Sequence, residues 1–315
     1  MGRDKQPKLG IFPGNVEPSP LPYPPGRYII PLINFTSEIN NDFLIGNNFC
    51  LKKFPDNEKN YIQHPDNFFL GKTLWEMISP ISFEESEFIL EYSWNANSGK
   101  PNIKFIMDEI GKIITTFRLF KKGNLGVSVI LGSTSLLARV PEDYKTERFN
   151  DKYNLCNSEL TNFLELYQIL GTYNVLRELE LTLSRFNKCY GRINNEDKII
   201  DLTVAIESCL LKDNQELSYK FCLRGTSVLS ELEKYKDTQE IFNRLKKLYN
   251  IRSKIVHEGK LLEDLKENDD YPNDVENLVR DLIIVLKDRI VNGLPLIKIK
   301  EGFDVEILNK LTKKT

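Results

Sequence analysis

Hydrophobic and polar residues follow two different patterns along the chain. Between Tyr28 and about Ser135, short runs rich in β-branched and aromatic residues are bounded by Gly, Pro and Asn, which is typical of β-strands. These runs are RYIIPLINF, DFLIGNNFCLKKF, EFILEYSW, KIITTFRLF and LGVSVILG. Asn102–Glu109 has a helical pattern that Gly111 would close, and SPISFEESEF indicates another short helix or turn. The first half is therefore predicted to be strand-rich but mixed.

From about Ser158 to Gly293 the apolar residues recur at helical spacing. Ser158 is a candidate N-cap for the first of six such segments. Asp237 and Glu240 have the spacing of a capping box at the start of the fifth, and Gly259 would end that helix. Six helices joined by short links predict a helical bundle.

The two patterns together predict an α+β fold. We expect a Pro-rich N-terminal arm over residues 1–27, which holds seven of the fifteen prolines. A mixed α/β domain with a sensing or regulatory role would follow over 28–150, and an all-α helical domain over 155–295. The remaining residues, 296–315, are expected to form a loose C-terminal tail.

Composition narrows the class of protein without naming a function. The formal net charge of −2 gives no reason for the whole surface to attract nucleic acid, so such a contact would need a local patch. Five scattered cysteines and two histidines predict free thiols, no metal site and no cofactor. No apolar run approaches the ~20 residues of a membrane span. We expect a soluble, cytoplasmic protein with no membrane partner.

One basic helix, predicted over Ile241–His257, departs from these ordinary patterns. Its apolar stripe is made by Ile241, Phe242, Leu245, Leu248, Tyr249, Ile255 and Val256. Arg252 falls in the middle of that stripe, where it needs an anion from this chain, a partner or a ligand. His257 lies about 140° around the helix from Arg252. The two would meet if the helix loosened before Gly259, or if two copies of the helix met across a dimer.

The same segment carries a local positive charge. Between Arg244 and Lys260 there are six basic residues and one acid, Glu258, an excess that suits a phosphate backbone. The candidate RNA-binding residues are Lys246, Lys247, Tyr249, Lys254 and Lys260. Tyr249 would stack on a base. The alternative is a solvated helix face with Tyr249 in the core.

Arginine and histidine without metal ligands support a narrow chemistry. An imidazole can take a proton from an RNA 2′-hydroxyl or protonate the leaving 5′-oxygen, and a guanidinium can hold the charge on the phosphorane oxygens. This chemistry cleaves RNA and leaves a 2′,3′-cyclic phosphate. The alternative is structural: Arg252 paired with a core carboxylate and His257 favoured by the helix dipole.

Several blocks of the sequence resemble a known family. RSKIVH matches the RxxxxH motif of the HEPN superfamily, whose active members are metal-independent ribonucleases. LTLSRFNKCYGRINNEDKIIDLTVAIESCLL, ELSYKFCLRGTSVLS and LYNIRSKIVHEGK are similar in order and spacing to the Apea-like HEPN family, over roughly residues 170–290. The resemblance implies a helical bundle that forms a homodimer through the motif helix, with Arg252 and His257 as the catalytic pair.

The resemblance also implies supporting residues. Ser253 stands at the polar position that follows the motif arginine. Glu207 matches an acid two helices earlier, and we expect it to be a buried partner for Arg252 or Arg224. Arg224 is expected to form an ion pair rather than to contact substrate.

These observations give a first hypothesis and two alternatives. The first is an RNA endonuclease in bacterial antiviral defence by abortive infection, released by a phage-derived trigger or a regulatory protein. The second is a non-catalytic HEPN module that binds RNA or a partner protein. The third is the toxin of a toxin–antitoxin pair, against which Gly259 counts, because the usual HxY continuation needs Tyr there.

Overall fold

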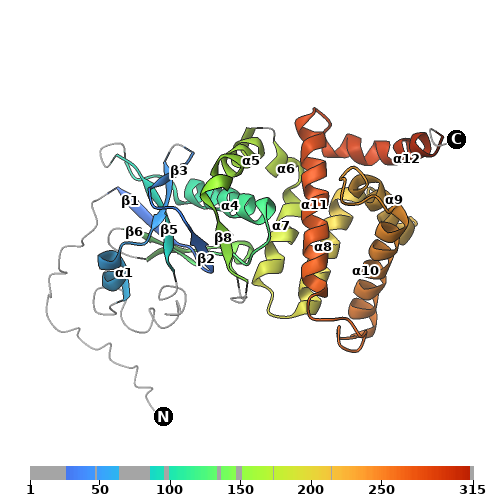
Figure 1. The fold of residues 1–315 in the computed structure, drawn as a ribbon, viewed down its shortest axis with the longest axis horizontal. Helices are drawn as coiled ribbons and strands as arrows, with labels where there is room; N and C mark the ends of the chain where they lie inside the picture. The colour runs from blue at the N-terminus through green and yellow to red at the C-terminus, as the bar shows by residue number, and fades with distance from the viewer. Residues whose placement is uncertain are drawn as a thin grey trace, which may run out of the picture.

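The computed structural model has an α+β fold, as the sequence predicts, with an antiparallel sheet at one end and helices at the other (Figure 1). It describes residues 26–46, 48–63, 86–95, 99–132, 136–146, 151–172, 174–213 and 215–312. The predicted N-terminal arm, up to residue 25, and most of SPISFEESEF lie outside the described residues.

The N-terminal part is built on a six-stranded antiparallel sheet with the strand order β3-β4-β5-β1-β6-β7. Its strands are β1 (Arg27–Pro31), β3 (Phe43–Ile45), β4 (Phe49–Lys53), β5 (Phe88–Ser93), β6 (Val129–Gly132) and β7 (Leu136–Arg139). β2 (Phe35–Ser37) and β8 (Tyr153–Leu155) form a separate parallel pair. A short helix, α1 (Asp56–Gln63), follows β4, which the hydrophobic pattern does not indicate.

Helix α4 (Ile103–Phe120) corrects two sequence predictions. The run KIITTFRLF is helical rather than a strand, and Gly111 lies inside the helix instead of closing it. Thr115 and Thr116 donate their hydroxyls to the carbonyls four residues earlier, which fits these β-branched residues into the helix. Gly111 allows close packing, because a Cβ there would lie 2.3 Å from the Tyr144 hydroxyl oxygen. Because α4 is buried on several faces, its apolar residues do not recur at a clear helical spacing in the sequence.

The helical part agrees closely with the six predicted segments. Its helices are α5 (Leu160–Thr172), α6 (Val175–Glu178), α7 (Glu180–Lys188), α8 (Asn195–Leu210), α9 (Leu217–Leu229), α10 (Thr238–Glu258), α11 (Tyr271–Val291) and α12 (Leu296–Thr312). One difference is that the second predicted helix is interrupted at Leu179, so that it forms α6 and α7.

Helix α12 replaces the loose tail expected over residues 296–315. It packs on the bundle through Ile299 and the fully buried Phe303. Asp304 pairs with Arg224, and Glu306 pairs with Arg289. These contacts lie 17 to 80 residues apart in sequence, so the short segment alone gave no sign of them.

Two hydrophobic cores meet at helices α4 and α5. On α5, Phe163 and Tyr167 belong to the core under the sheet, whereas Leu166 and Leu170 belong to the core of the bundle. Arg118, at the end of α4, is fully buried and donates hydrogen bonds to Asn187 on α7. The two halves of the protein therefore share a packed, hydrogen-bonded interface.

Two further features concern membranes and thiols. Over the described part of the chain, no helix has both the length and the apolarity that crossing a bilayer requires.

The five cysteines are free, and three of them, Cys189, Cys209 and Cys222, are buried. Burial raises the pKa of the Cys189 and Cys209 thiols to about 12, so both stay protonated and unreactive at neutral pH.

Candidate functional site

Helix α10 lies at the far side of the bundle from the sheet (Figure 1) and carries the candidate residues. The Asp237 side chain caps its start by accepting hydrogen bonds from the Gln239 and Glu240 amides, both at 2.9 Å. Its end is set by Gly259, which adopts the left-handed conformation with φ 63°. The helix is continuous through Glu258, so it does not loosen ahead of Gly259 in the way that would bring Arg252 and His257 together.

The buried face of α10 differs slightly from the predicted stripe. It consists of Ile241, Leu245, Leu248, Ile251 and Ile255. Val256, expected to be in the stripe, is 45% exposed. At the level of Arg252 the buried face is made by Ile251 and Ile255, so Arg252 lies beside this face rather than at its centre.

Arg252 is only loosely paired. Its side chain is 23% exposed, and its Nη2 atom lies 4.0 Å from Oε2 of Glu207 on α8. The Nε atom is buried, and the described residues offer it no hydrogen-bond partner. Burial raises the pKa of Glu207 by more than Arg252 lowers it. This guanidinium therefore keeps a free capacity to bind an anion.

Glu207 and Arg224 have separate roles. Of the two expected partners for Glu207, the one it contacts is Arg252. Arg224 forms the expected ion pair, but with Asp304 of α12, at 3.0 Å to each carboxylate oxygen. Arg224 also donates to the Leu210 carbonyl. It therefore fastens α12 to α8 and α9.

His257 is exposed in the last turn of α10. On this regular helix it lies about 140° from Arg252, and the half-buried Ser253 lies between them at about 100°. His257 instead shares its face of the helix with the exposed Lys246 and Lys254. The structure thus separates the two motif residues within one chain and brings His257 together with the lysines.

Tyr249 lies at the edge of this face of α10, about 60° around the helix from Lys246 and about 140° from Lys254. Its ring is half-buried and meets the Phe221 ring edge-to-face, with 5.4 Å between the ring centroids. Burial raises the pKa of the Tyr249 hydroxyl, and the nearby Glu207 raises it further. In this packing the ring of Tyr249 belongs more to the bundle than to a stacking surface.

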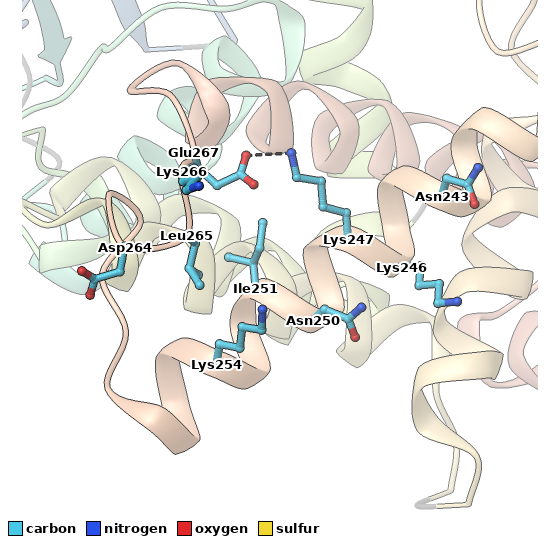
Figure 2. A pocket seen from close by; sticks show the side chains of 10 residues that line it. All are labelled: Asn243, Lys246, Lys247, Asn250, Ile251, Lys254, Asp264, Leu265, Lys266 and Glu267. Carbon is cyan, nitrogen blue, oxygen red and sulfur yellow. Dashed lines mark ion pairs between the residues drawn. The ribbon is translucent and has the colours of Figure 1, made fainter.

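A groove of about 500 Å³ runs between α10 and the loop that follows it. Figure 2 shows Lys246, Lys247 and Lys254 along the helix side, with Lys266 and Glu267 on the loop side. Lys247 forms an ion pair with Glu267 at 2.7 Å. Lys260, predicted with the others, is exposed beyond the helix end and does not line the groove.

Sequence reasoning missed the loop side of this groove. Lys266 lies in LLEDLKENDD, which is acidic overall and gives no local sign of an anion site. Asn243 and Asn250 also line the groove from α10. Asn243, Lys246, Asn250 and Lys254 follow one another at steps of three, four and four residues, which places them on one face of the helix. This polar stripe is the signal in the sequence that could have indicated the groove.

Neither metal-ligand geometry nor known relatives adds to this picture. In the part of the chain that the structure describes, no three His, Cys, Asp or Glu residues are grouped so that they could hold a metal ion. No model of a protein family, no curated protein and no solved structure matches the chain.

Proposed function

We propose that the chain is a metal-independent RNA endonuclease of the HEPN type that acts as a homodimer. The observation that carries the proposal is the state of Arg252, a largely buried guanidinium with a weak partner and an unsatisfied Nε atom. A phosphate oxygen is the kind of anion that would satisfy it. The exposed His257 and the basic face of α10 supply a proton-transfer group and a backbone contact.

In this mechanism the imidazole of His257 takes the proton from the 2′-hydroxyl, or donates one to the leaving 5′-oxygen. The 2′-oxygen attacks the adjacent phosphorus, the bond to the 5′-oxygen breaks, and a 2′,3′-cyclic phosphate results. Arg252 stabilises the negative charge that develops on the phosphorane oxygens. DNA is not a substrate because it lacks the nucleophile.

The separation of about 140° between Arg252 and His257 supports a dimeric site. One protomer would contribute its His257 and the other its Arg252, because a straight helix presents them on different faces. Activity would then fall with dilution below the dimer dissociation constant. Sedimentation across micromolar concentrations measures the dimer dissociation constant, and cleavage assays over the same range measure the activity. A monomer with undiminished activity would contradict the dimeric site.

In a cell, we propose that the sheet-containing half regulates cleavage during phage infection. The buried Arg118 and Arg280 support this part of the proposal, since they connect α4 with α7 and α11. A trigger that shifts α4 would move the bundle that carries the site.

The test is cleavage of a labelled single-stranded RNA in EDTA by wild-type protein, Arg252→Ala and His257→Ala. We expect either substitution to reduce cleavage by a factor on the order of 10²–10⁴, with cyclic-phosphate ends in the wild-type product. Arg177→Ala, an exposed arginine on α6, is the matched control. Folded Arg252→Ala and His257→Ala proteins that cleave like wild type would refute the assignment.

The same observation of separate faces favours one other function, RNA binding without cleavage. In that case wild-type protein and both variants leave the RNA intact, while wild-type protein still binds it. The salt dependence of binding then measures the number of phosphate contacts.

A further inference from the structure

The groove beside α10 has the lining of an anion site rather than of a pocket for an apolar molecule. Eight of its ten lining residues are polar, and four of those are lysines against two acids. Pockets for small apolar ligands are lined mainly by hydrophobic and aromatic side chains. The lining here carries a net charge of +2, from four lysines minus two acids, in a protein whose total is −2.

The loop side of the groove is fixed by the protein itself. Leu262 is buried, and its amide donates to Glu196 on α8 at 2.9 Å. The amide of Glu267 donates back to the Leu262 carbonyl at 3.1 Å, and that of Lys266 to the Glu263 carbonyl at 3.0 Å. A groove formed before its ligand arrives costs less ordering entropy on binding.

Three of the lysines are available to a ligand. In the described part of the chain no carboxylate lies within ion-pair distance of Lys246, Lys254 or Lys266, whereas Lys247 is held by Glu267. The carboxylate of Asp264 accepts a hydrogen bond from the Leu261 amide. It points away from the lysines of α10 in Figure 2.

The polar stripe of α10 that lines the groove continues past it along the helix to His257. Asn243, Lys246, Asn250, Lys254 and His257 follow one another at steps of three, four, four and three residues. That spacing keeps them on one exposed face, over roughly 21 Å of helix at 1.5 Å per residue. A stripe of this length is longer than one phosphate group and is long enough to contact several consecutive phosphates of a chain.

We propose that this groove binds the phosphate backbone of single-stranded RNA next to the phosphate that is cleaved. The inference rests on the proposed function, since it assigns the path by which the substrate reaches His257. Lys246, Lys254 and Lys266 contact successive phosphates, and the amides of Asn243 and Asn250 donate to phosphate or ribose oxygens. Glu267 competes with the RNA for Lys247, so incoming RNA exchanges one anion for another.

The experiment measures RNA affinity separately from cleavage. The full-length protein carries His257→Ala throughout, and a fluorescent 20-nucleotide single-stranded RNA reports binding at several salt concentrations. Lys246→Gln, Lys254→Gln and Lys266→Gln are combined in the groove variant. The matched control is Lys122→Gln, Lys152→Gln and Lys298→Gln, exposed lysines outside the groove with the same total charge change.

We expect the groove variant to bind RNA about 10- to 100-fold more weakly at low salt. Because three phosphate contacts are lost, the slope of log K against log salt concentration becomes shallower by roughly two units. The control variant stays within about twofold of the parent. Glu267→Gln frees Lys247 and tightens binding by about two- to fivefold. This opposite sign cannot come from damage to the fold.

Three results would overturn the inference. These are equal weakening in the groove and control variants, no detectable binding of RNA by the parent protein, and complete competition by inorganic triphosphate at concentrations similar to the RNA. The last would make the groove a site for free phosphates. If the groove variant loses RNA binding and wild-type protein does not cleave RNA, the groove proposal is supported and the nuclease proposal is refuted.

If wild-type protein cleaves RNA and the groove variant binds RNA as tightly as its parent, the nuclease proposal is supported and the groove proposal is refuted.

Discussion

Two arginines, Arg118 on α4 and Arg252 on α10, lie at opposite ends of the helical bundle and differ in how they are satisfied. Arg118 is fully buried, and the five N–H groups of its guanidinium make six hydrogen-bond contacts, because the two on Nη1 serve three acceptor atoms. Its acceptors are the carbonyls of Leu125, Asp143, Lys145 and Asn187 and the side-chain amide oxygen of Asn187. Its guanidinium also lies over the Tyr190 ring, 4.1 Å from the centroid.

Arg252 has none of this support. It has a single carboxylate at 4.0 Å and a buried Nε atom without a partner in the described residues. A buried cation surrounded by well-aligned acceptors holds a structure together, while one left partly unsatisfied is available to a ligand. The contrast separates a structural interface at one end of the bundle from a candidate site at the other.

The largest expected difference is in stability. Replacing Arg118 by Met leaves several buried carbonyls without donors, and we expect it to lower the free energy of unfolding by roughly 3–5 kcal/mol. Arg252→Met removes a poorly paired charge, so we expect a change of less than about 1 kcal/mol. Urea unfolding of the three proteins measures both values. Equal losses would remove the distinction between the two arginines.

The network around Arg118 extends to a second buried group, and pH tests it. Glu276 on α11 is buried, which works against its charge, but Lys198 and Arg280 lower its pKa to about 2. Because this pKa lies below the unfolded value of about 4.3, the stabilisation is present above that value and is lost as the pH falls from 4.3 toward 2.

We expect Glu276→Gln to cost about 3 kcal/mol near neutral pH and progressively less as the pH falls toward 2. Glu267→Gln, which removes an acid from the more exposed ion pair with Lys247, would change stability by less than about 1 kcal/mol across the range. Unfolding midpoints measured between pH 2 and pH 7 show this. Parallel curves for wild type and Glu276→Gln would contradict the assignment.

The smallest expected effect concerns Glu207, next to Arg252. Burial raises the pKa of Glu207, so the fold accepts its neutral form better than its charged form. Its contribution is therefore most favourable below the unfolded pKa and declines as the pH rises through the higher folded value. We expect Glu207→Gln to be neutral or to stabilise by less than about 1 kcal/mol at pH 7. A loss of 2 kcal/mol or more would instead make the pair with Arg252 a structural one.

The helical half shows how far the sequence alone leads. Periodicity and caps such as Asp237 and Gly259 act between near neighbours, so the limits of α8, α10 and α11 could be predicted within a few residues. Helix α4 could not, because its second half is rich in β-branched residues and buried on several faces. Helix α12 was missed because its partners, Arg224 and Arg289, are contributed by other helices.

For the candidate site, the sequence by itself determined which residues α10 carries and the angle of about 140° between Arg252 and His257, since these follow from helix geometry. Tertiary structure alone decided that Arg252 turns toward Glu207 and keeps an unsatisfied Nε atom. It also decided that Lys266 joins the lysines of α10 across a groove. The physical reason is that burial and charge pairing depend on segments that meet only when the bundle packs.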